Sequence, residues 1–189
     1  MTDVRALLEE TGALLTGHFE LSSGRHSDVY VQKQRVFEHP EATSAIGEAM
    51  AEQWRPAGPT VVVAPAVGAI TLGFATARAL GVRFLFTERA DGRMHLRRGQ
   101  ALDPSDQVLV VEDVVTTGGS AAEVVEAVRA TGARVIGVAA MVDRSNAPSS
   151  LTFTALLAID ADDWDPADCP LCRDARPLES PGSRHLSGT

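Results

Sequence analysis

The chain has 189 residues, which suits one domain with a sizeable core, and its 44% of hydrophobic residues include no apolar run of membrane-spanning length. Its formal net charge of −8 argues against non-specific nucleic-acid binding. The first residues lack the basic-then-apolar layout of a signal peptide, so we expect a cytoplasmic protein with no membrane partner.

Hydrophobic spacing along the chain predicts alternating helices and strands. Helical spacing is found in four segments, at residues 3–15, 41–54, 69–80 and 120–131, and Gly81 and Gly132 are placed to end the last two. Buried-strand runs are found at residues 60–64, 82–86, 108–112 and 135–142. Repeated strand–helix–strand units predict an α/β fold, a parallel sheet with helices on both faces. Ligands of such sheets bind at the carboxyl ends of the strands, and the loops there are 65–69, 87–101, 113–119 and 143–149.

The most informative stretch is residues 108–120, Val-Leu-Val-Val-Glu-Asp-Val-Val-Thr-Thr-Gly-Gly-Ser. We expect Glu112 and Asp113 to end the strand, and the sequence from Ser120 to Glu123 to open a helix as a capping box. Helix N–H groups and flexible glycines favour an anion at this turn. Carboxylates would repel a bare phosphate, whereas a sugar phosphate explains both features, with its ribose hydroxyls on the acids. The alternative is a solvated strand-to-helix turn.

This order of residues closely resembles the phosphoribosyl-pyrophosphate (PRPP) binding motif of type I phosphoribosyltransferases. The resemblance implies a type I phosphoribosyltransferase core in which loop 65–69 turns N–H groups toward pyrophosphate. It also implies Mg²⁺ as cofactor, arriving largely with PRPP. The implied PRPP-binding residues are consecutive: Glu112, Asp113, Val114, Val115, Thr116, Thr117, Gly118, Gly119 and Ser120.

Loop 87–101 carries four arginines and a histidine. It can be a solvated surface, but its place beside the proposed phosphate site favours phosphate recognition. In the family, the matching mobile loop closes over PRPP and reaches the partner subunit's site, which implies a homodimer with shared active sites. The implied catalytic residues are Arg89, Arg93, His95 and Arg97. The loop has no lysine, since Lys33 is the one lysine of the chain, so His95 or simple electrostatics must replace a lysine acid.

The segment 17–34, expected to be an ordered hairpin, has the order F-x-L-x-S-G-x-x-S-x-x-Y. It resembles the hood that covers the pyrimidine in orotate phosphoribosyltransferases, although Ser22 stands where many members have lysine. Arg144, in Asp143-Arg144-Ser145, matches the family's arginine that pairs with the orotate carboxylate, and Thr116 would contact the base. The resemblance implies one domain over residues 1–189, with a hood at about 1–40, a core at about 41–160 and a tail at about 161–189. The implied reaction converts orotate and Mg-PRPP into orotidine 5′-monophosphate and pyrophosphate.

The tail holds both cysteines, Cys169 and Cys172, in C-x-x-C spacing. They could be half of a zinc site completed across a dimer, a redox pair or two buried thiols. The five histidines show no metal-ligand spacing, so no protein-bound metal is firmly expected.

Two other functions stay open. A phosphoribosyltransferase for another base would keep residues 112–120 but would not need Arg144. A non-catalytic regulator that binds PRPP or a nucleotide could lose the cationic residues of the loop. This chain keeps arginines there, which favours catalysis.

Overall fold

The computed structural model describes residues 2–21, 23–144 and 152–181. The chain divides into two compact units. The core unit consists of Met1–Val4 and Phe37–Ile159, and the small unit of Arg5–Val36 and Asp160–Thr189. None of the helices in the described residues is long and apolar enough to cross a membrane.

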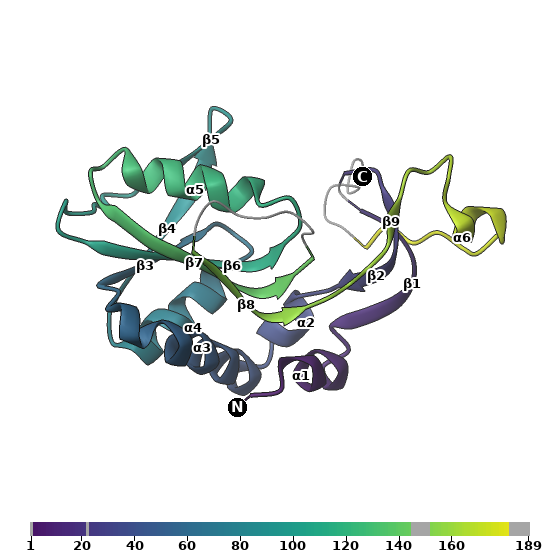
Figure 1. Ribbon diagram of the computed structural model, residues 1–189, viewed down its shortest axis with the longest axis horizontal. Helices are drawn as coiled ribbons and strands as arrows, with labels where there is room; N and C mark the ends of the chain where they lie inside the picture. The colour runs from purple at the N-terminus through teal and green to yellow at the C-terminus, as the bar shows by residue number, and fades with distance from the viewer. Residues whose placement is uncertain (1, 22, 145–151, 182–189) are drawn as a thin grey trace. The chain divides into compact units, whose positions relative to one another are not determined.

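The core unit is built on a six-stranded sheet with the order β5-β4-β3-β6-β7-β8 (Figure 1). All neighbouring strands are parallel except β4 and β5. The strands are β3 (Val61–Pro65), β4 (Arg83–Ala90), β5 (Arg93–Leu96), β6 (Gln107–Val115), β7 (Arg134–Asp143) and β8 (Phe153–Ala158). The predicted parallel α/β sheet is therefore confirmed, and its central strands β3 and β6 are almost entirely buried.

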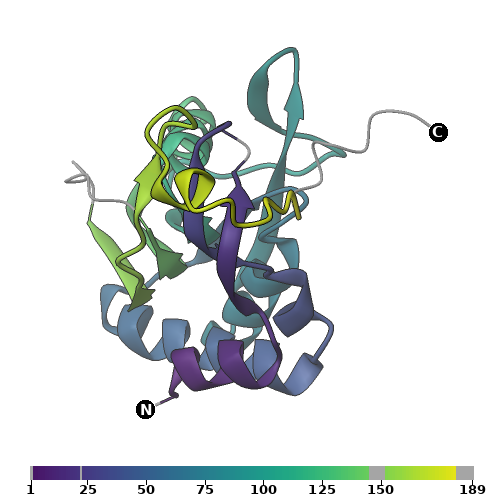
Figure 2. The same ribbon diagram turned by 90° about the vertical axis from the view of Figure 1, so that its right-hand side faces the viewer.

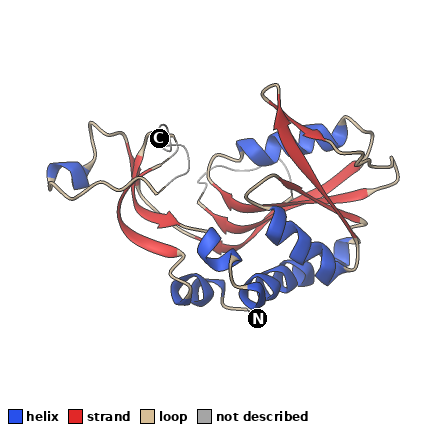
Figure 3. Ribbon diagram, turned by 180° about the vertical axis from the view of Figure 1, so that it is seen from behind, coloured by secondary structure: helices blue, strands red, loops and turns tan. Residues whose placement is uncertain are grey.

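Helices cover both faces of this sheet, with α3 (Pro40–Trp54) and α4 (Ile70–Leu80) on one face and α5 (Gly119–Arg129) on the other (Figures 1 and 3). Helix α5 buries a valine stripe, Val124, Val125 and Val128, against valines of β3 and β6. The predicted helices at 41–54, 69–80 and 120–131 are confirmed, with small shifts at their ends. Gly81 ends α4 in the left-handed conformation, with φ of 75°. Short helices α2 (Gln34–Phe37) and η1 (Arg55–Ala57) flank α3.

A tight contact holds α3 against the sheet. A Cβ atom at Gly137 of β7 would collide with the Trp54 ring and lie 2.8 Å from the Thr152 carbonyl oxygen. The Trp54 indole N–H also donates to Thr154 Oγ1 at 2.8 Å, so the ring is held between β7 and β8. Glycine at 137 is required because the ring occupies the space of a side chain.

The small unit joins both ends of the chain (Figure 2). Its sheet has the order β1-β2-β9, formed by β1 (Leu14–Glu20), β2 (His26–Val31) and β9 (Asp163–Trp164). All pairs are antiparallel, so the predicted hairpin at 17–34 is confirmed. The tail continues through α6 (Pro170–Arg173) to Glu179, which exchanges backbone hydrogen bonds with residues 18 and 20 of β1 at 2.8 Å.

The helix predicted over residues 3–15 is confirmed up to Glu10 and wrong beyond it. Helix α1 (Val4–Glu10) stops after two turns, and Gly12 takes a positive φ of 64°. Residues from Leu14 then pair with β2. The apolar residues at 13–15 therefore serve a strand, a choice that helical spacing alone does not reveal.

Candidate active site

The acid pair lies inside β6 rather than at its end. The strand was expected to stop at Glu112, but it continues to Val115 because Val114 and Val115 extend the ladder with β7. Glu112 and Asp113 are consequently buried, with 5% and 3% of their surface exposed. Consecutive strand residues point to opposite faces, so the two carboxylates approach the strand end from two sides. Asp113 Oδ1 accepts a hydrogen bond from the Val114 N–H at 2.6 Å.

The turn after β6 presents hydroxyl and backbone groups to solvent. Thr116, Thr117, Gly119 and Ser120 are exposed, and Gly118 has a left-handed φ of 75°. The predicted capping box is wrong, because the N-cap residue is Gly118 and no side chain caps α5. Ala122 N–H is the first to bond within the helix, to Gly118 O at 2.9 Å. The preceding N–H groups and the helix dipole would favour an anion at this turn.

Two neighbouring loops leave the same edge of the sheet. After β3, the Ala66 N–H donates to Thr87 O at 2.7 Å, the Ala66–Val67 peptide is cis, and the Val67 side chain is 80% exposed. After β7, the half-buried Arg144 donates its N–H to Val115 O at 2.8 Å. Because β3, β6 and β7 are adjacent and parallel, these segments lie beside the turn at 116–119.

The segment expected to be a mobile loop at 87–101 is largely a β-hairpin. Strand β4 continues to Ala90, and Asp91-Gly92 forms a two-residue turn with φ of 50° and 77° before β5. Positive φ at both positions is the geometry that favours Asp-Gly in hairpins, and this dipeptide was the signal that the sequence prediction missed. The side chain of Gln100 accepts a hydrogen bond from the Phe86 N–H at 2.9 Å and donates one to the Phe86 carbonyl oxygen at 3.2 Å. These two bonds hold the segment after β5 against β4.

The cationic side chains of the hairpin divide into two groups. Arg89 pairs with Glu123 of α5 at 2.6 Å, and Arg98 makes two hydrogen bonds to Glu88 at 2.9 and 3.0 Å. These bonds from Arg98 hold the pKa of Glu88 below its usual value. The other group is exposed and makes no side-chain hydrogen bond or ion pair with any described residue; its members are Arg93, His95 and Arg97.

Ser22 and Ser145 lie outside the described residues, so their predicted places are not seen. Prediction from sequence missed a further group in the small unit: the β1–β2 hairpin brings His18 and His26 to the two cysteines of the tail. The sequence indicated Cys169 and Cys172 as possible zinc ligands, but the spacing of the two histidines gave no such signal, because a strand pairing brings them together.

A parallel sheet with two buried carboxylates and a hydroxyl–glycine turn at one strand end, beside a cationic hairpin, is a site for a phosphorylated sugar bearing a second anionic group. Fold and site together define the class of the type I phosphoribosyltransferases. The family model of the phosphoribosyl transferase domain matches residues 32–169.

Proteins named orotate phosphoribosyltransferase are similar to nearly the whole chain. The one from Chlorobaculum parvum is 48% identical over 97% of this chain and 96% of its own length. The one from Thermotoga maritima is 47% identical over 97% of this chain and 99% of its own length. The solved orotate phosphoribosyltransferase of Mycobacterium tuberculosis is 29% identical, with a TM-score of 0.68 over 84% of this chain and 97% of that one. The chain belongs to the orotate phosphoribosyltransferase family.

Proposed function

We propose that this protein transfers the 5-phosphoribosyl group from Mg-PRPP to orotate, giving orotidine 5′-monophosphate and pyrophosphate for pyrimidine synthesis. One observation carries the proposal: the buried acid pair of β6 is followed directly by the hydroxyl–glycine turn that leads into α5, in a chain 48% identical to an orotate phosphoribosyltransferase. The whole chain acts as one phosphoribosyltransferase domain, and the β1–β2 segment is the hood that the resemblance implies.

The turn between β6 and α5 holds the ribose phosphate of PRPP. The exposed hydroxyls of Thr116, Thr117 and Ser120 and the N–H groups at the start of α5 donate to the 5′-phosphate, whose charge the helix dipole favours. Glu112 and Asp113 accept from the ribose hydroxyls. Gly118 allows the backbone to approach the phosphate closely. Its positive φ favours glycine, and no protein atom lies within 4 Å of the place where a Cβ would stand.

The base is held at the end of β7. Arg144 pairs with the orotate carboxylate through its planar guanidinium, and Thr116 contacts the base from the neighbouring turn. The backbone bond from Arg144 N–H to Val115 O fixes the arginine beside the PRPP turn. This contact supports a position of the base next to the anomeric carbon of the ribose.

Displacement at the anomeric carbon passes through an oxocarbenium-like transition state and needs little covalent help from the protein. Positioning of the two substrates, exclusion of water and stabilisation of the leaving pyrophosphate supply most of the rate. Arg93, His95 and Arg97 bind the pyrophosphate, since these exposed side chains make no hydrogen bond or ion pair with described residues, and Arg89 is a further contact.

The donor set at the end of β6 fits the magnesium that the family implies. Glu112 and Asp113 offer carboxylate oxygens, which Mg²⁺ prefers, while PRPP brings its own phosphate and hydroxyl oxygens. When bound, the ion would neutralise part of the pyrophosphate charge. The residues that would hold it on the protein side are these two acids.

The protein acts as a homodimer with shared active sites in the cytoplasm, as expected from the sequence. Phe74 of α4 supports a dimer, because 59% of this aromatic side chain is exposed while it stacks edge-on against Phe84. Aromatic residues are enriched at the contacts between protein subunits.

Purified protein with PRPP and Mg²⁺ tests the function against a panel of orotate, uracil, adenine and hypoxanthine. We expect orotidine 5′-monophosphate and pyrophosphate in equal amounts, with orotate strongly preferred. Turnover of another base in preference to orotate would replace the proposed substrate. PRPP binding without turnover of any base would instead identify a regulator.

A further inference from the structure

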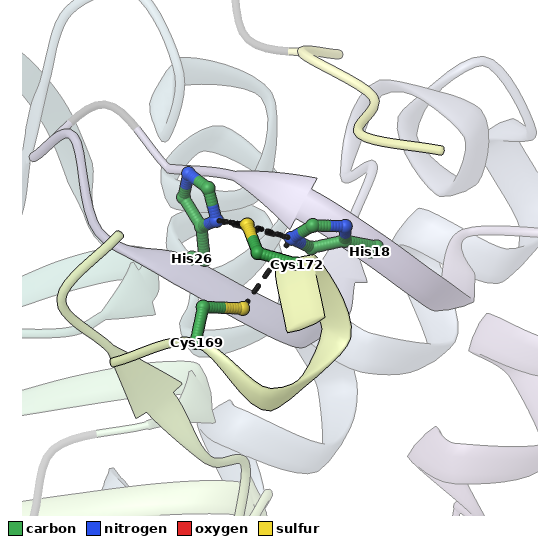
Figure 4. Close-up of side chains that lie close together, drawn as sticks. All are labelled: His18, His26, Cys169 and Cys172. Atoms are coloured by element: carbon green, nitrogen blue, oxygen red, sulfur yellow. Dashed lines mark hydrogen bonds between the residues drawn. The ribbon is translucent and has the colours of Figure 1, made fainter. Parts of the chain in front are cut away.

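Four side chains that can bind a metal converge inside the small unit. His18 lies on β1, His26 on β2, and Cys169 and Cys172 flank the first turn of α6 (Figure 4). One ligand atom from each residue lies within 4.8 Å of all the others. All four residues come from one chain, so the cluster is complete without a partner subunit.

Four of the six distances between these atoms are close to the edges of a tetrahedron around zinc. With Zn–N of about 2.0–2.1 Å and Zn–S of about 2.3 Å, ideal geometry requires N···N of about 3.3 Å and S···N of about 3.5 Å. His18 Nε2 lies 3.0 Å from His26 Nδ1. The sulfur-to-nitrogen distances are 3.5 Å from Cys169 to His18, and 3.7 and 3.3 Å from Cys172 to His18 and His26.

Hydrogen bonding alone does not account for this arrangement. His18 Nδ1 faces the Arg176 carbonyl oxygen at 3.0 Å, and a carbonyl oxygen only accepts, so Nδ1 carries the proton. In the neutral ring, Nε2 then has one lone pair, yet three potential partners surround it. One cation at their centre would use that lone pair and satisfy all four groups together. The bond to Arg176 O is also the outer contact that typically orients a zinc-bound histidine.

The surroundings suit a structural site. His18 and His26 are only 3% and 6% exposed, and Cys169 is fully buried, while Cys172 is exposed and offers a path of entry. The Cys-Pro-Leu-Cys segment turns back on itself, with the Arg173 N–H bonded to Cys169 O at 3.3 Å, which directs both sulfurs to one point.

We propose that His18, His26, Cys169 and Cys172 bind one structural zinc ion. Thiolate and imidazole ligands in a closed tetrahedron are typical of Zn²⁺ and leave no position for a reacting water. The ion stabilises the small unit, whose other buried apolar residues in the described chain are Leu8, Ala13, Phe19, Val31 and Val36. So small a core gains from a metal that links the hairpin to a tail about 150 residues later.

Metal content tests the site directly. Untagged protein, purified without added zinc or chelator, should hold one zinc per chain by mass spectrometry. Cys172→Ser should lose most of it, since the change removes a ligand at an exposed position. As a control, His39→Gln changes an exposed histidine outside the cluster and should keep the full amount of zinc. Zinc at wild-type level in Cys172→Ser, or none in the wild type, would overturn the proposal.

Two measurements on the wild type decide the matter even if the variants fold poorly. Cobalt put in place of zinc should show the thiolate charge-transfer and visible bands of tetrahedral coordination. Removing zinc with phenanthroline should lower the Tm by several degrees, and zinc but not Mg²⁺ should restore it. An octahedral cobalt spectrum, an unchanged Tm, or a disulfide between the cysteines in place of two free thiols would count against the site.

Discussion

At the scale of single residues, the buried acid pair has the largest consequence for binding. Carboxylates buried as deeply as Glu112 and Asp113 are unfavourable unless something interacts with them, which is typical of functional groups. Because their side chains leave opposite faces of β6, each is expected to contribute separately to the PRPP site.

We predict that Glu112→Gln and Asp113→Asn each weaken PRPP binding by about 1–3 kcal/mol, the range for a hydrogen bond to a charged group, and that the double variant is weaker still. Calorimetry gives the affinity, and the Tm shows whether the fold persists. Asp103→Asn, an exposed acid before the other end of β6, serves as control. Unchanged PRPP affinity at unchanged Tm would reject the assignment.

Arg144 is the residue that we propose selects the base. Arg144→Ala should weaken orotate binding by about 2–5 kcal/mol, the cost of truncating a buried charge pair, and PRPP or uracil binding much less. Arg144→Lys should recover only part, since lysine keeps the charge but loses the planar fork. The measurement is the affinity for each ligand. Equal losses for orotate and PRPP, or no loss for orotate, would remove orotate as substrate while the phosphoribosyltransferase function stands.

At the scale of elements, the β4–β5 hairpin separates cations that hold the fold from cations available to a ligand. Arg93→Ala, His95→Ala and Arg97→Ala should each lower kcat more than orotate affinity, because charge on the departing pyrophosphate is greatest in the transition state. Steady-state kinetics gives both quantities. For Arg89, Glu123→Gln breaks the same ion pair without removing the cation, so it shows how much of the Arg89→Ala effect is structural. Wild-type rates in all these variants would make the hairpin a solvated surface.

The start of β6 depends on Asp106, which is 7% exposed. Burial alone would raise the pKa of its carboxyl, but hydrogen bonds from the Asp103 N–H, Arg83 and Thr60 hold the pKa below its usual value. Because the pKa of Asp106 is lower in the folded than in the unfolded protein, its ionised carboxylate contributes stability above the unfolded pKa of about 3.9. This contribution is lost as the pH falls through the folded-state pKa.

Asp106→Asn should therefore cost about 1–3 kcal/mol at neutral pH, and the difference from wild type should shrink below about pH 4. Urea unfolding across this pH range measures it. Asp160→Asn, a change at an exposed acid outside this hydrogen-bond network, is the control. A difference that stays constant down to the lowest pH would show that the charge of Asp106 does not contribute.

At the scale of the whole molecule, shared active sites predict complementation between two inactive variants. If the hairpin of one subunit serves the site of the other, a mixture of Arg93→Ala and Asp113→Asn should recover roughly a quarter of wild-type activity. Random exchange makes half of the dimers mixed, and each mixed dimer keeps one intact site. Activity after mixing and subunit exchange is the measurement. No recovery, with mixed dimers detected by mass spectrometry, would place hairpin and acid pair in the same subunit's site.

The sequence by itself determined the α/β core and the PRPP turn, because both depend on patterns local in the chain. Valine runs mark β3 and β6, periodic apolar residues mark α3, α4 and α5, and the acids, hydroxyls and glycines of residues 112–120 follow one another directly in the chain. Local patterns were less reliable at element ends. The apolar residues after Glu10 suit helix or strand, and the acids of β6 did not end the strand because the ladder to β7 continues through Val115.

Only the tertiary structure decided which distant residues meet. Pairing of β4 with β5 turned an expected loop into a hairpin and divided its arginines between Glu88, Glu123 and solvent. Pairing of β1 with β2, and of Glu179 with β1, brought His18 and His26 to cysteines about 150 residues away. Such contacts depend on strand register and on the path of the chain in space, which residue spacing within a segment does not encode.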